Sequence, residues 1–235
     1  MKKVMNFMKK RIGTLSAVIM IMIVLLSGFS AKAQDKRGKV LFIGDSMTGW
    51  LAERLNAYGE ENGFDVATVV WDSSTISKWG SSPKMAALIE EQDPDAVFLS
   101  LGMNELFEAN PAKLKGDVDN IKAAIGDRPM VWVGPPSWPG HDKGKVLNDW
   151  LENEIGEGSF YRSFGLDLPR QSAKNPHPTR QGMIKWMDEV VEWLPEHSSV
   201  KLNFDKKPAE SHMSRGKVFI YRRGGGEQLS VWVEG

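Results

Sequence analysis

The chain contains no cysteine among its 235 residues. This absence excludes disulfide bonds, thiolate metal sites, a lipid-modified cysteine and a cysteine nucleophile. The chain also lacks a net charge, because 30 basic residues balance 30 acidic residues. It has no internal repeat or low-complexity block, and 41% of its residues are hydrophobic. Length and composition therefore predict one folded domain of ordinary size with a sizeable core.

The N-terminal segment has no acidic residue and combines a basic start with an apolar run. Five basic residues lie within residues 1–11, and an apolar run of 15 residues occupies positions 15–29. The small-x-small sequence AKA follows and ends at Ala33. This pattern predicts a secretory signal peptide cleaved after Ala33, and hence an exported protein, periplasmic or extracellular. The alternative is an uncleaved membrane anchor, although a spanning helix needs about 20 apolar residues.

Removal of residues 1–33 changes the charge of the chain. The segment holds six basic residues and no acidic one, which leaves 24 basic against 30 acidic residues, a net charge of −6. Neither sign is clustered in the remaining sequence. A protein of this charge without a basic patch is a poor candidate for nucleic-acid binding. No second long apolar run follows, so no membrane span is expected after signal removal.

Apolar segments typical of buried strands alternate with segments of helical periodicity. Strands are expected at residues 39–44, 64–71, 95–102 and 129–136, with a weaker one at 159–165. Helices are expected at residues 48–63, 82–92, 110–126, 143–156 and 179–194. This alternation predicts a three-layer α/β/α domain with a parallel sheet of about five strands.

Polar residues of a particular kind follow the expected strands. Ser46 follows the first strand, Ser74 the second and Asn104 the third, and His177 precedes the last helix. Ligands of such sheets bind at the carboxyl ends of the strands, so these residues are expected to lie together. A hydroxyl nucleophile, an imidazole base and neutral hydrogen-bond donors are what acyl transfer requires. Turn or helix-cap roles are the alternative for the serines and the asparagine.

Three short motifs, in this order, resemble the sequence blocks of the SGNH (GDSL-type) hydrolases. They are Gly-Asp-Ser at residues 44–46, Gly-Met-Asn at residues 102–104 and His-Pro at residues 177–178. The resemblance covers about residues 38–195 and looks closest to envelope-associated bacterial members. It implies a flavodoxin-like α/β/α fold and a serine esterase that uses no metal or organic cofactor.

The resemblance also implies a role for each matched residue. Ser46 would be the nucleophile and His177 the general base. The N–H of Ser46 and the side-chain amide of Asn104 would stabilise the oxyanion. The family's second block usually supplies a glycine N–H, but no glycine ends the second strand here. The N–H of Ser74 is the expected substitute, with that of Thr75 next.

The sequence departs from the family pattern at two positions. Glu105 replaces the aspartate that follows the asparagine of the third block, and Lys174 replaces the aspartate three residues before His177. A lysine cannot accept a hydrogen bond from the imidazole. Three alternatives remain: a Ser46–His177 dyad with a backbone carbonyl as acceptor, a replacement acid such as Asp167, or a slow or inactive enzyme.

Residues 34–195 are thus expected to form an SGNH hydrolase-like domain. Residues 196–235 would form an extension without an assigned function, either a small β appendage or a poorly packed tail. The first function hypothesis is an exported serine esterase that removes acyl or acetyl groups from small or carbohydrate-linked substrates. Trp50, Trp79 and Trp138 near the strand ends favour carbohydrate, unless they pack in the core. A non-catalytic glycan-binding or envelope-assembly module and an acyltransferase are the alternatives.

Overall fold

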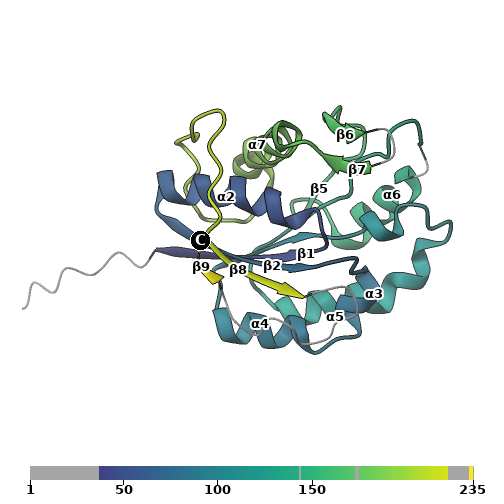
Figure 1. The fold of residues 1–235 in the computed structure, drawn as a ribbon. Coiled ribbons are helices and arrows are strands. Elements are labelled where there is room, and N and C mark those ends of the chain that lie inside the picture. Colours follow the sequence, from purple (N-terminus) through teal and green to yellow (C-terminus); the bar gives the residue numbers. More distant parts are fainter. Residues whose placement is uncertain (1–36, 143, 173–174, 222–232, 235) are drawn as a thin grey trace, which may run out of the picture. The chain divides into compact units, whose positions relative to one another are not determined.

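The computed structural model describes residues 37–142, 144–172, 175–221 and 233–234 (Figure 1). The predicted signal peptide and Lys174 lie outside these residues. Within the described ranges, no helix is both long enough and apolar enough to cross a membrane.

Six parallel strands form the central sheet, and a short antiparallel strand extends one edge (Figure 1). The parallel strands are β1 (Gly38–Gly44), β2 (Phe64–Trp71), β3 (Ala96–Ser100), β4 (Met130–Val133), β5 (Phe160–Tyr161) and β8 (Lys217–Tyr221), and the added strand is β9 (Val233–Glu234). Their order is β5-β4-β3-β1-β2-β8-β9. Strands β1 to β5 therefore have the 2-1-3-4-5 order of flavodoxin-like sheets, which confirms the expected fold.

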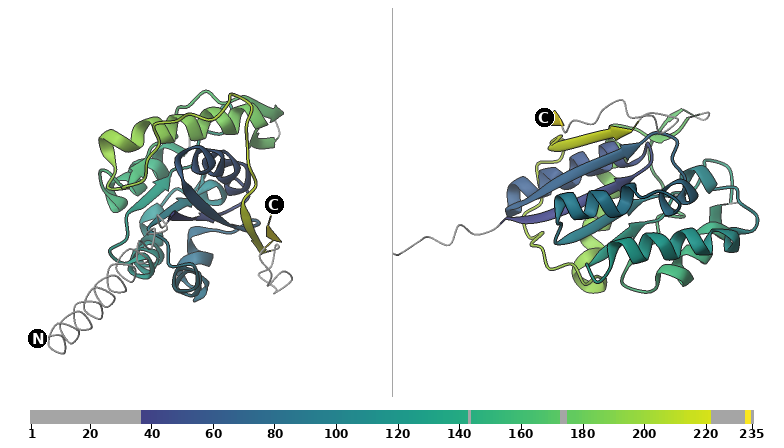
Figure 2. Two further views of the ribbon diagram at one scale, coloured as in Figure 1. Left: turned by 90° about the vertical axis from the view of Figure 1, so that its left-hand side faces the viewer. Right: turned by 90° about the horizontal axis from the view of Figure 1, so that it is seen from below.

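Helices cover both faces of the sheet, as expected for strands that are apolar along their whole length (Figures 1 and 2). The helices of one face are α2 (Thr48–Asn62) and α7 (Arg180–His197), and those of the other are α3 (Ile76–Gly80), α4 (Lys84–Gln92), α5 (Lys115–Ile125) and α6 (Gly144–Ile155). Successive side chains of β1 enter the two cores in turn: Phe42 packs on the α2 and α7 side, and Ile43 on the opposite side.

Three short elements near the predicted site, one helix and two strands, were not expected from the sequence. The helix α3 has five residues, which is too short for a helical period to be recognised. Strands β6 (Arg170–Ser172) and β7 (Asn175–Pro178) form a separate antiparallel pair where a loop was expected. Strands this short and polar have no apolar alternation to predict them. His177 therefore lies on a strand.

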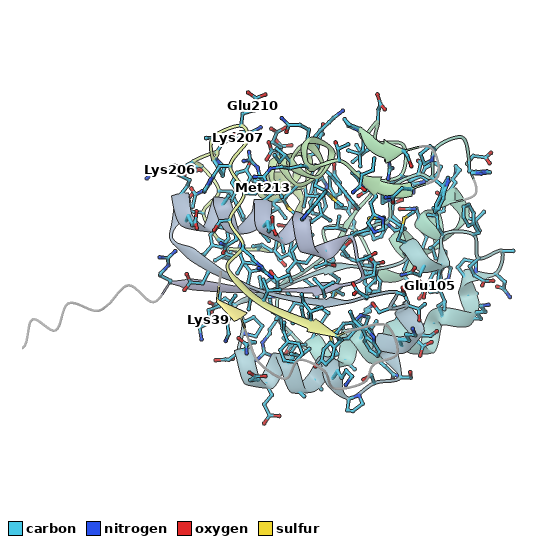
Figure 3. The ribbon with its side chains drawn as sticks, viewed as in Figure 1. Lys39, Glu105, Lys206, Lys207, Glu210 and Met213 are labelled. Atoms are coloured by element: carbon cyan, nitrogen blue, oxygen red, sulfur yellow. The ribbon has the colours of Figure 1, made fainter. Side chains whose placement is uncertain are left out.

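Two strands of the C-terminal segment, β8 and β9, belong to the main sheet. Strand β8 pairs in parallel with β2, so that Thr68 lies opposite Val218 and Val70 opposite Ile220. Residues 200–204, which alternate like a strand, have no regular structure. The chain then passes beside α2, where Figure 3 labels several of its side chains, and reaches the sheet edge at β8.

A buried arginine fixes the path of this segment. Arg54 of α2 is fully buried and donates to the two carboxylate oxygens of Asp188 in α7, at 2.7 and 3.1 Å. It also donates to the backbone oxygens of Pro208, Ala209 and His212. Because an unpaired buried guanidinium is strongly destabilising, these carbonyl groups hold the segment against α2.

Candidate active site

Ser46 lies in the turn between β1 and α2, next to the point where the strand order reverses. The turn is tight, because a Cβ atom at Gly44 would overlap the backbone oxygen of Ser100. The buried Asp45 holds the turn by accepting the N–H of Met47 at Oδ1, at 2.9 Å. Ser46 is left exposed at the carboxyl edge of the sheet, where α/β proteins bind their ligands.

Ser46 and His177 are in hydrogen-bond contact although 131 residues separate them in sequence. Ser46 Oγ lies 2.9 Å from His177 Nε2. Strand β7 carries the histidine directly before α7, at the same end of the sheet as the carboxyl ends of the strands (Figure 1). This distance allows a serine hydroxyl to pass its proton to the imidazole. The fold thus brings together the predicted nucleophile and the predicted base.

The other imidazole nitrogen contacts a residue to which the sequence assigned no role. Asn175 Oδ1 lies 2.8 Å from His177 Nδ1 and also accepts the backbone N–H of His177 at 3.1 Å. An amide oxygen accepts hydrogen bonds and cannot donate them, so Nδ1 carries the proton. In the neutral imidazole, Nε2 is then the unprotonated nitrogen and accepts the proton of Ser46.

The side-chain amide of Asn175 is held in one orientation. Its Nδ2 donates to Gln171 Oε1 at 2.8 Å, across the β6–β7 pair. Its backbone N–H donates to Ser172 Oγ at 3.1 Å. Exchange of the amide oxygen and nitrogen would place two carbonyl oxygens against each other at Gln171, so this network assigns the oxygen to His177.

The surroundings of His177 favour the neutral imidazole. Burial lowers the pKa of His177 below its ordinary value of 6.5, and the positive charge of Arg170 lowers it further. The negative charge of Asp72 acts in the opposite direction. The imidazole is therefore uncharged at pH 7, which is the state that can act as a general base.

The contacts of His177 show which group takes the place of the aspartate that the family pattern puts beside the imidazole. Asp167 is exposed, and its backbone oxygen accepts a hydrogen bond from Lys185 Nζ at 2.9 Å. Its charge is not among those that shift the pKa of His177. The acceptor at Nδ1 is instead the side-chain oxygen of Asn175, two residues before the histidine, where the sequence suggested a backbone carbonyl.

Asn104 lies in a short 3-10 turn, Met103–Glu105, that follows β3. Gly102 precedes it with a φ angle of 112°, which favours glycine, and a Cβ atom there would lie 3.2 Å from Pro135. Asn104 Nδ2 donates to the backbone oxygen of Ser74 at 2.6 Å. The amide nitrogen has a second hydrogen, which this bond does not use.

Ser74 is buried, and its polar groups are engaged within the protein. Its N–H donates to the backbone oxygen of Trp71 at 3.0 Å, and its Oγ accepts from Trp79 Nε1 at 2.9 Å. The expectation of a free Ser74 N–H facing the oxyanion is therefore not met. Ser73 before it has a φ angle of 56°, a conformation that favours glycine. Ser74 instead connects the end of β2 to α3 and to Asn104.

Two buried carboxyl groups lie next to the candidate residues. Asp45 precedes Ser46, and Glu105 follows Asn104 and accepts the N–H of Ile76 at 2.5 Å. Within the described residues, Asp45 Oδ2 and Glu105 Oε2 are buried without a hydrogen-bond partner. Burial raises the pKa of Asp45 to about 7 and that of Glu105 to about 7, to which the charge of Asp45 contributes. Figure 3 shows Glu105 at the carboxyl end of the sheet.

Ionisable side chains elsewhere in the described ranges do not cluster as a metal site would require. In these ranges no group of three or more histidine, aspartate or glutamate side chains could hold a metal ion.

The three tryptophans near the strand ends differ in exposure. Trp79 is fully buried in the core, and Trp138 is partly buried against Phe107, with ring centroids 5.6 Å apart. Trp50 is 41% exposed and lines a pocket of about 310 Å³ to which Ser46 and His177 also contribute. Core packing therefore accounts for Trp79, and Trp50 is the one of the three that lines this pocket.

No protein-family model and no curated protein matches the chain. Among solved structures, the chain is similar to a protein described as a GDSL-like lipase from Bacteroides ovatus, with 12% identity and a TM-score of 0.51 over 72% of this chain and 56% of that one. It is also similar to a gut microbial diltiazem-metabolizing enzyme, with 10% identity and a TM-score of 0.50 over 68% of this chain and 47% of that enzyme. A protein described as a lipolytic member of the G-D-S-L family from Desulfitobacterium hafniense has 15% identity and a TM-score of 0.47 over 65% of this chain and 97% of that protein.

The chain spans about half the length of the Bacteroides protein and of the diltiazem-metabolizing enzyme. At such low identity the similarity shows the fold and nothing finer. The chain has the three-layer α/β/α fold of the GDSL hydrolases.

Proposed function

We propose that the protein is a serine esterase that hydrolyses carboxylic esters through a covalent acyl-enzyme. The observation that supports this most is the continuous chain of contacts from Ser46 to His177 to Asn175, at 2.9 and 2.8 Å. A nucleophile, a base in hydrogen-bond reach and a third group that orients the base are the arrangement on which nucleophilic acyl transfer depends.

In the first step, His177 Nε2 takes the proton of Ser46 while Oγ attacks the ester carbonyl carbon. The carbonyl oxygen becomes an oxyanion, which the second hydrogen of Asn104 Nδ2 and the N–H of Ser46 stabilise. The bond to the alcohol oxygen then breaks, and the protonated imidazole gives its proton to the leaving alcohol. The acyl group remains on Ser46.

In the second step, water replaces the alcohol. His177 takes a proton from the water molecule, whose oxygen attacks the acyl carbon. The new oxyanion collapses, the carboxylic acid leaves, and Ser46 Oγ recovers the proton from His177. Throughout, Asn175 keeps Nδ1 protonated and the ring oriented, but as a neutral group it supplies no negative charge opposite the imidazolium.

Two finer parts of the proposal concern location and substrate. The basic, apolar and AKA pattern of residues 1–33 supports export to the periplasm or the extracellular space. An acyl or acetyl group on carbohydrate is the proposed substrate, supported by the exposed ring of Trp50 beside Ser46 and His177. Aromatic rings of this kind present a flat apolar face to a ligand.

The non-catalytic alternative rested on the lysine at position 174. Asn175 provides an acceptor for the imidazole, so the absence of the family aspartate is no longer a reason to expect an inactive site. An acyltransferase would share every residue of this mechanism and differ only in the acceptor of the acyl group, and no described feature favours it over hydrolysis.

The test is turnover of p-nitrophenyl acetate by purified protein and two variants. Ser46→Ala should abolish turnover, and Asn104→Ala should lower kcat by about 100- to 1,000-fold, the usual loss for one oxyanion donor. Circular dichroism would establish that both variants are folded. Wild-type turnover by folded Ser46→Ala protein would refute the proposal.

A further inference from the structure

The C-terminal segment contributes part of the wall of the pocket beside Ser46. The pocket has a volume of about 310 Å³, near the lower limit of the ~300–1,000 Å³ typical of small-molecule sites. Ser46 and His177 line it together with Arg215, Val218 and Ile220 from the C-terminal segment. Substrate bound at the candidate nucleophile would therefore meet a wall that lies outside the family-like region.

One buried hydroxyl in this pocket has no hydrogen-bond partner among the residues that the structure describes. Thr68 of β2 lines the pocket and is 2% exposed. Within the described residues, its Oγ1 makes no hydrogen bond. Buried polar groups are nearly always satisfied, and the position of this one in a pocket points to a ligand that bonds to it.

Charged and polar side chains surround the same space. Glu53 of α2 lines the pocket, and the positive charges of Arg180 and Arg215 act on its carboxyl group. Asp72 and Gln171 also line it. The pocket therefore offers two carboxylates, a guanidinium and an amide, which together both donate and accept hydrogen bonds.

Apolar side chains form the remaining wall. Val70 and Ile220 occupy paired positions of β2 and β8, and Val218 lies opposite Thr68. Trp50 adds an exposed ring from α2. The pocket thus combines an aromatic and aliphatic surface with hydrogen-bonding groups of both kinds.

Hydrogen bonds hold the C-terminal wall in place. The N–H of Ser214 donates to the backbone oxygen of Glu53 at 2.9 Å, and Asn56 Nδ2 donates to Ser214 Oγ at 2.9 Å. Arg54 fixes the preceding residues, as described above. The backbone that precedes Arg215 is therefore tied to α2, and the backbone that follows it pairs with β2 from Lys217 onward.

We propose that this pocket binds the alcohol part of the ester, and that this part is a hydroxyl-rich ring such as a sugar. This inference rests on the proposed esterase function. A sugar ring has apolar C–H faces for Trp50 and the valine side chains, and hydroxyl groups that donate to Glu53 and accept from Arg215 and Thr68.

Other ligand classes fit the pocket less well. An alkyl chain would leave the buried hydroxyl of Thr68 without a partner, which is unfavourable, and would offer no hydrogen bond to Glu53 or Arg215. An anionic ligand would meet the carboxylates of Glu53 and Asp72, and like charges repel. A neutral ligand with several hydroxyl groups satisfies the polar groups without either penalty.

The test compares two acetate esters whose alcohols share a six-membered ring. One is a monoacetylated methyl glucoside, and the other is cyclohexyl acetate, which lacks the hydroxyl groups. The variants are Thr68→Val, which keeps the side-chain shape, and Arg215→Gln. The control is Lys206→Gln, which removes a positive charge from an exposed position of the same segment.

Both pocket variants should lose about tenfold in kcat/KM on the glucoside ester, as expected for one lost hydrogen bond to a polar ligand. Their kcat/KM on cyclohexyl acetate should stay within about twofold of the wild-type value, since that alcohol makes no such bond. The control should change neither. An equal loss on both esters, no loss on either, or a wild-type preference for cyclohexyl acetate would overturn the subsite.

The outcomes also separate this inference from the proposed function. If Ser46→Ala protein still hydrolyses both esters, the esterase assignment fails. If hydrolysis depends on Ser46 but the pocket variants do not discriminate between the esters, the assignment stands and the subsite alone fails.

Discussion

At the scale of single residues, a neutral asparagine takes the position next to the imidazole that the family pattern gives to an acid. In serine proteases, replacing that aspartate by asparagine lowers kcat by about 10⁴-fold, because the imidazole adopts the wrong tautomer. Here Gln171 fixes the Asn175 amide so that its oxygen faces Nδ1. The tautomer is therefore the productive one, and only the stabilising charge is absent.

This arrangement predicts opposite effects for two substitutions at one position. Asn175→Ala should lower kcat by about 100-fold or more, because the base is no longer oriented. Asn175→Asp should raise kcat and shift the acidic limb of the pH profile to higher pH, since a carboxylate favours the imidazolium. Steady-state rates between pH 5 and 9 measure both effects.

A second pair of variants tests the orientation of the Asn175 amide, with the control on the neighbouring helix α7. Gln171→Leu should lose part of the activity, because the Asn175 amide is then free to rotate, whereas Gln181→Leu at an exposed position of α7 should not. Wild-type kcat in Asn175→Ala protein would show that another group orients His177.

The sequence contained part of this residue-level picture. Ser46 and His177 were recognisable because each belongs to a short motif at an expected strand end. Asn175 was overlooked because the family spacing directed attention to position 174, although Asn-Pro-His is itself a signal that a neutral acceptor lies near the base. The engagement of the Ser74 N–H depends on the positive φ angle of Ser73, which sequence patterns do not reveal.

At the scale of elements, long periodic segments were predictable and short ones were not. The helices α2 and α7 have enough turns for an apolar face to be recognised, whereas α3 has five residues and β6 and β7 are short polar strands paired within residues 170–178. Alternation in residues 217–221 indicated a strand but could not identify its partner. Pairing with β2 follows from the anchoring of the preceding chain on α2.

This anchoring predicts that one buried side chain stabilises the element arrangement. Arg54→Met should lower the free energy of unfolding by about 3–5 kcal/mol, because Asp188 and the backbone oxygens lose a buried partner. Arg128→Met should lower it by about 0–1 kcal/mol, since its ion pair with Asp93 is exposed. Urea denaturation measures both values, and equal losses would contradict the anchoring role.

At the scale of the whole molecule, the alternation of strands and helices was sufficient to predict the three-layer fold and the edge that carries the site. The strand order places the carboxyl end of β1 at the point where the order reverses, and the Gly-Asp-Ser motif lies at that end. The sequence did not reveal that this edge also contains two buried carboxyl groups of raised pKa. Their raised pKa values arise from burial in the folded protein, which no sequence motif indicates.

These groups predict how stability depends on pH. The pKa of Asp45 and of Glu105 is about 7 in the folded protein, above the ordinary values of 3.8 and 4.5. Between these values the folded state binds more protons than the unfolded state, so the free energy of unfolding falls as pH rises from about 4.5 to 7. The contribution is fully present below the ordinary pKa values and is lost above pH 7.

Asp45→Asn and Glu105→Gln should therefore each weaken the decline in stability between pH 5 and pH 8. Asp119→Asn, which changes an exposed carboxylate of α5, is the matched control and should leave it unchanged. Urea denaturation at the two pH values measures the difference. An unchanged decline in both buried-site variants would show that these carboxyl groups are ionised in the folded protein at pH 5.

The central claim is that Ser46 is a nucleophile activated by His177, and covalent labelling with a fluorophosphonate tests it most directly. The folded wild-type protein should gain the mass of one phosphonyl group, which peptide mapping should locate on Ser46. Ser46→Ala protein should gain no mass, and His177→Ala protein should react far more slowly. No adduct on folded wild-type protein, or equal labelling of Ser46→Ala protein, would contradict the account.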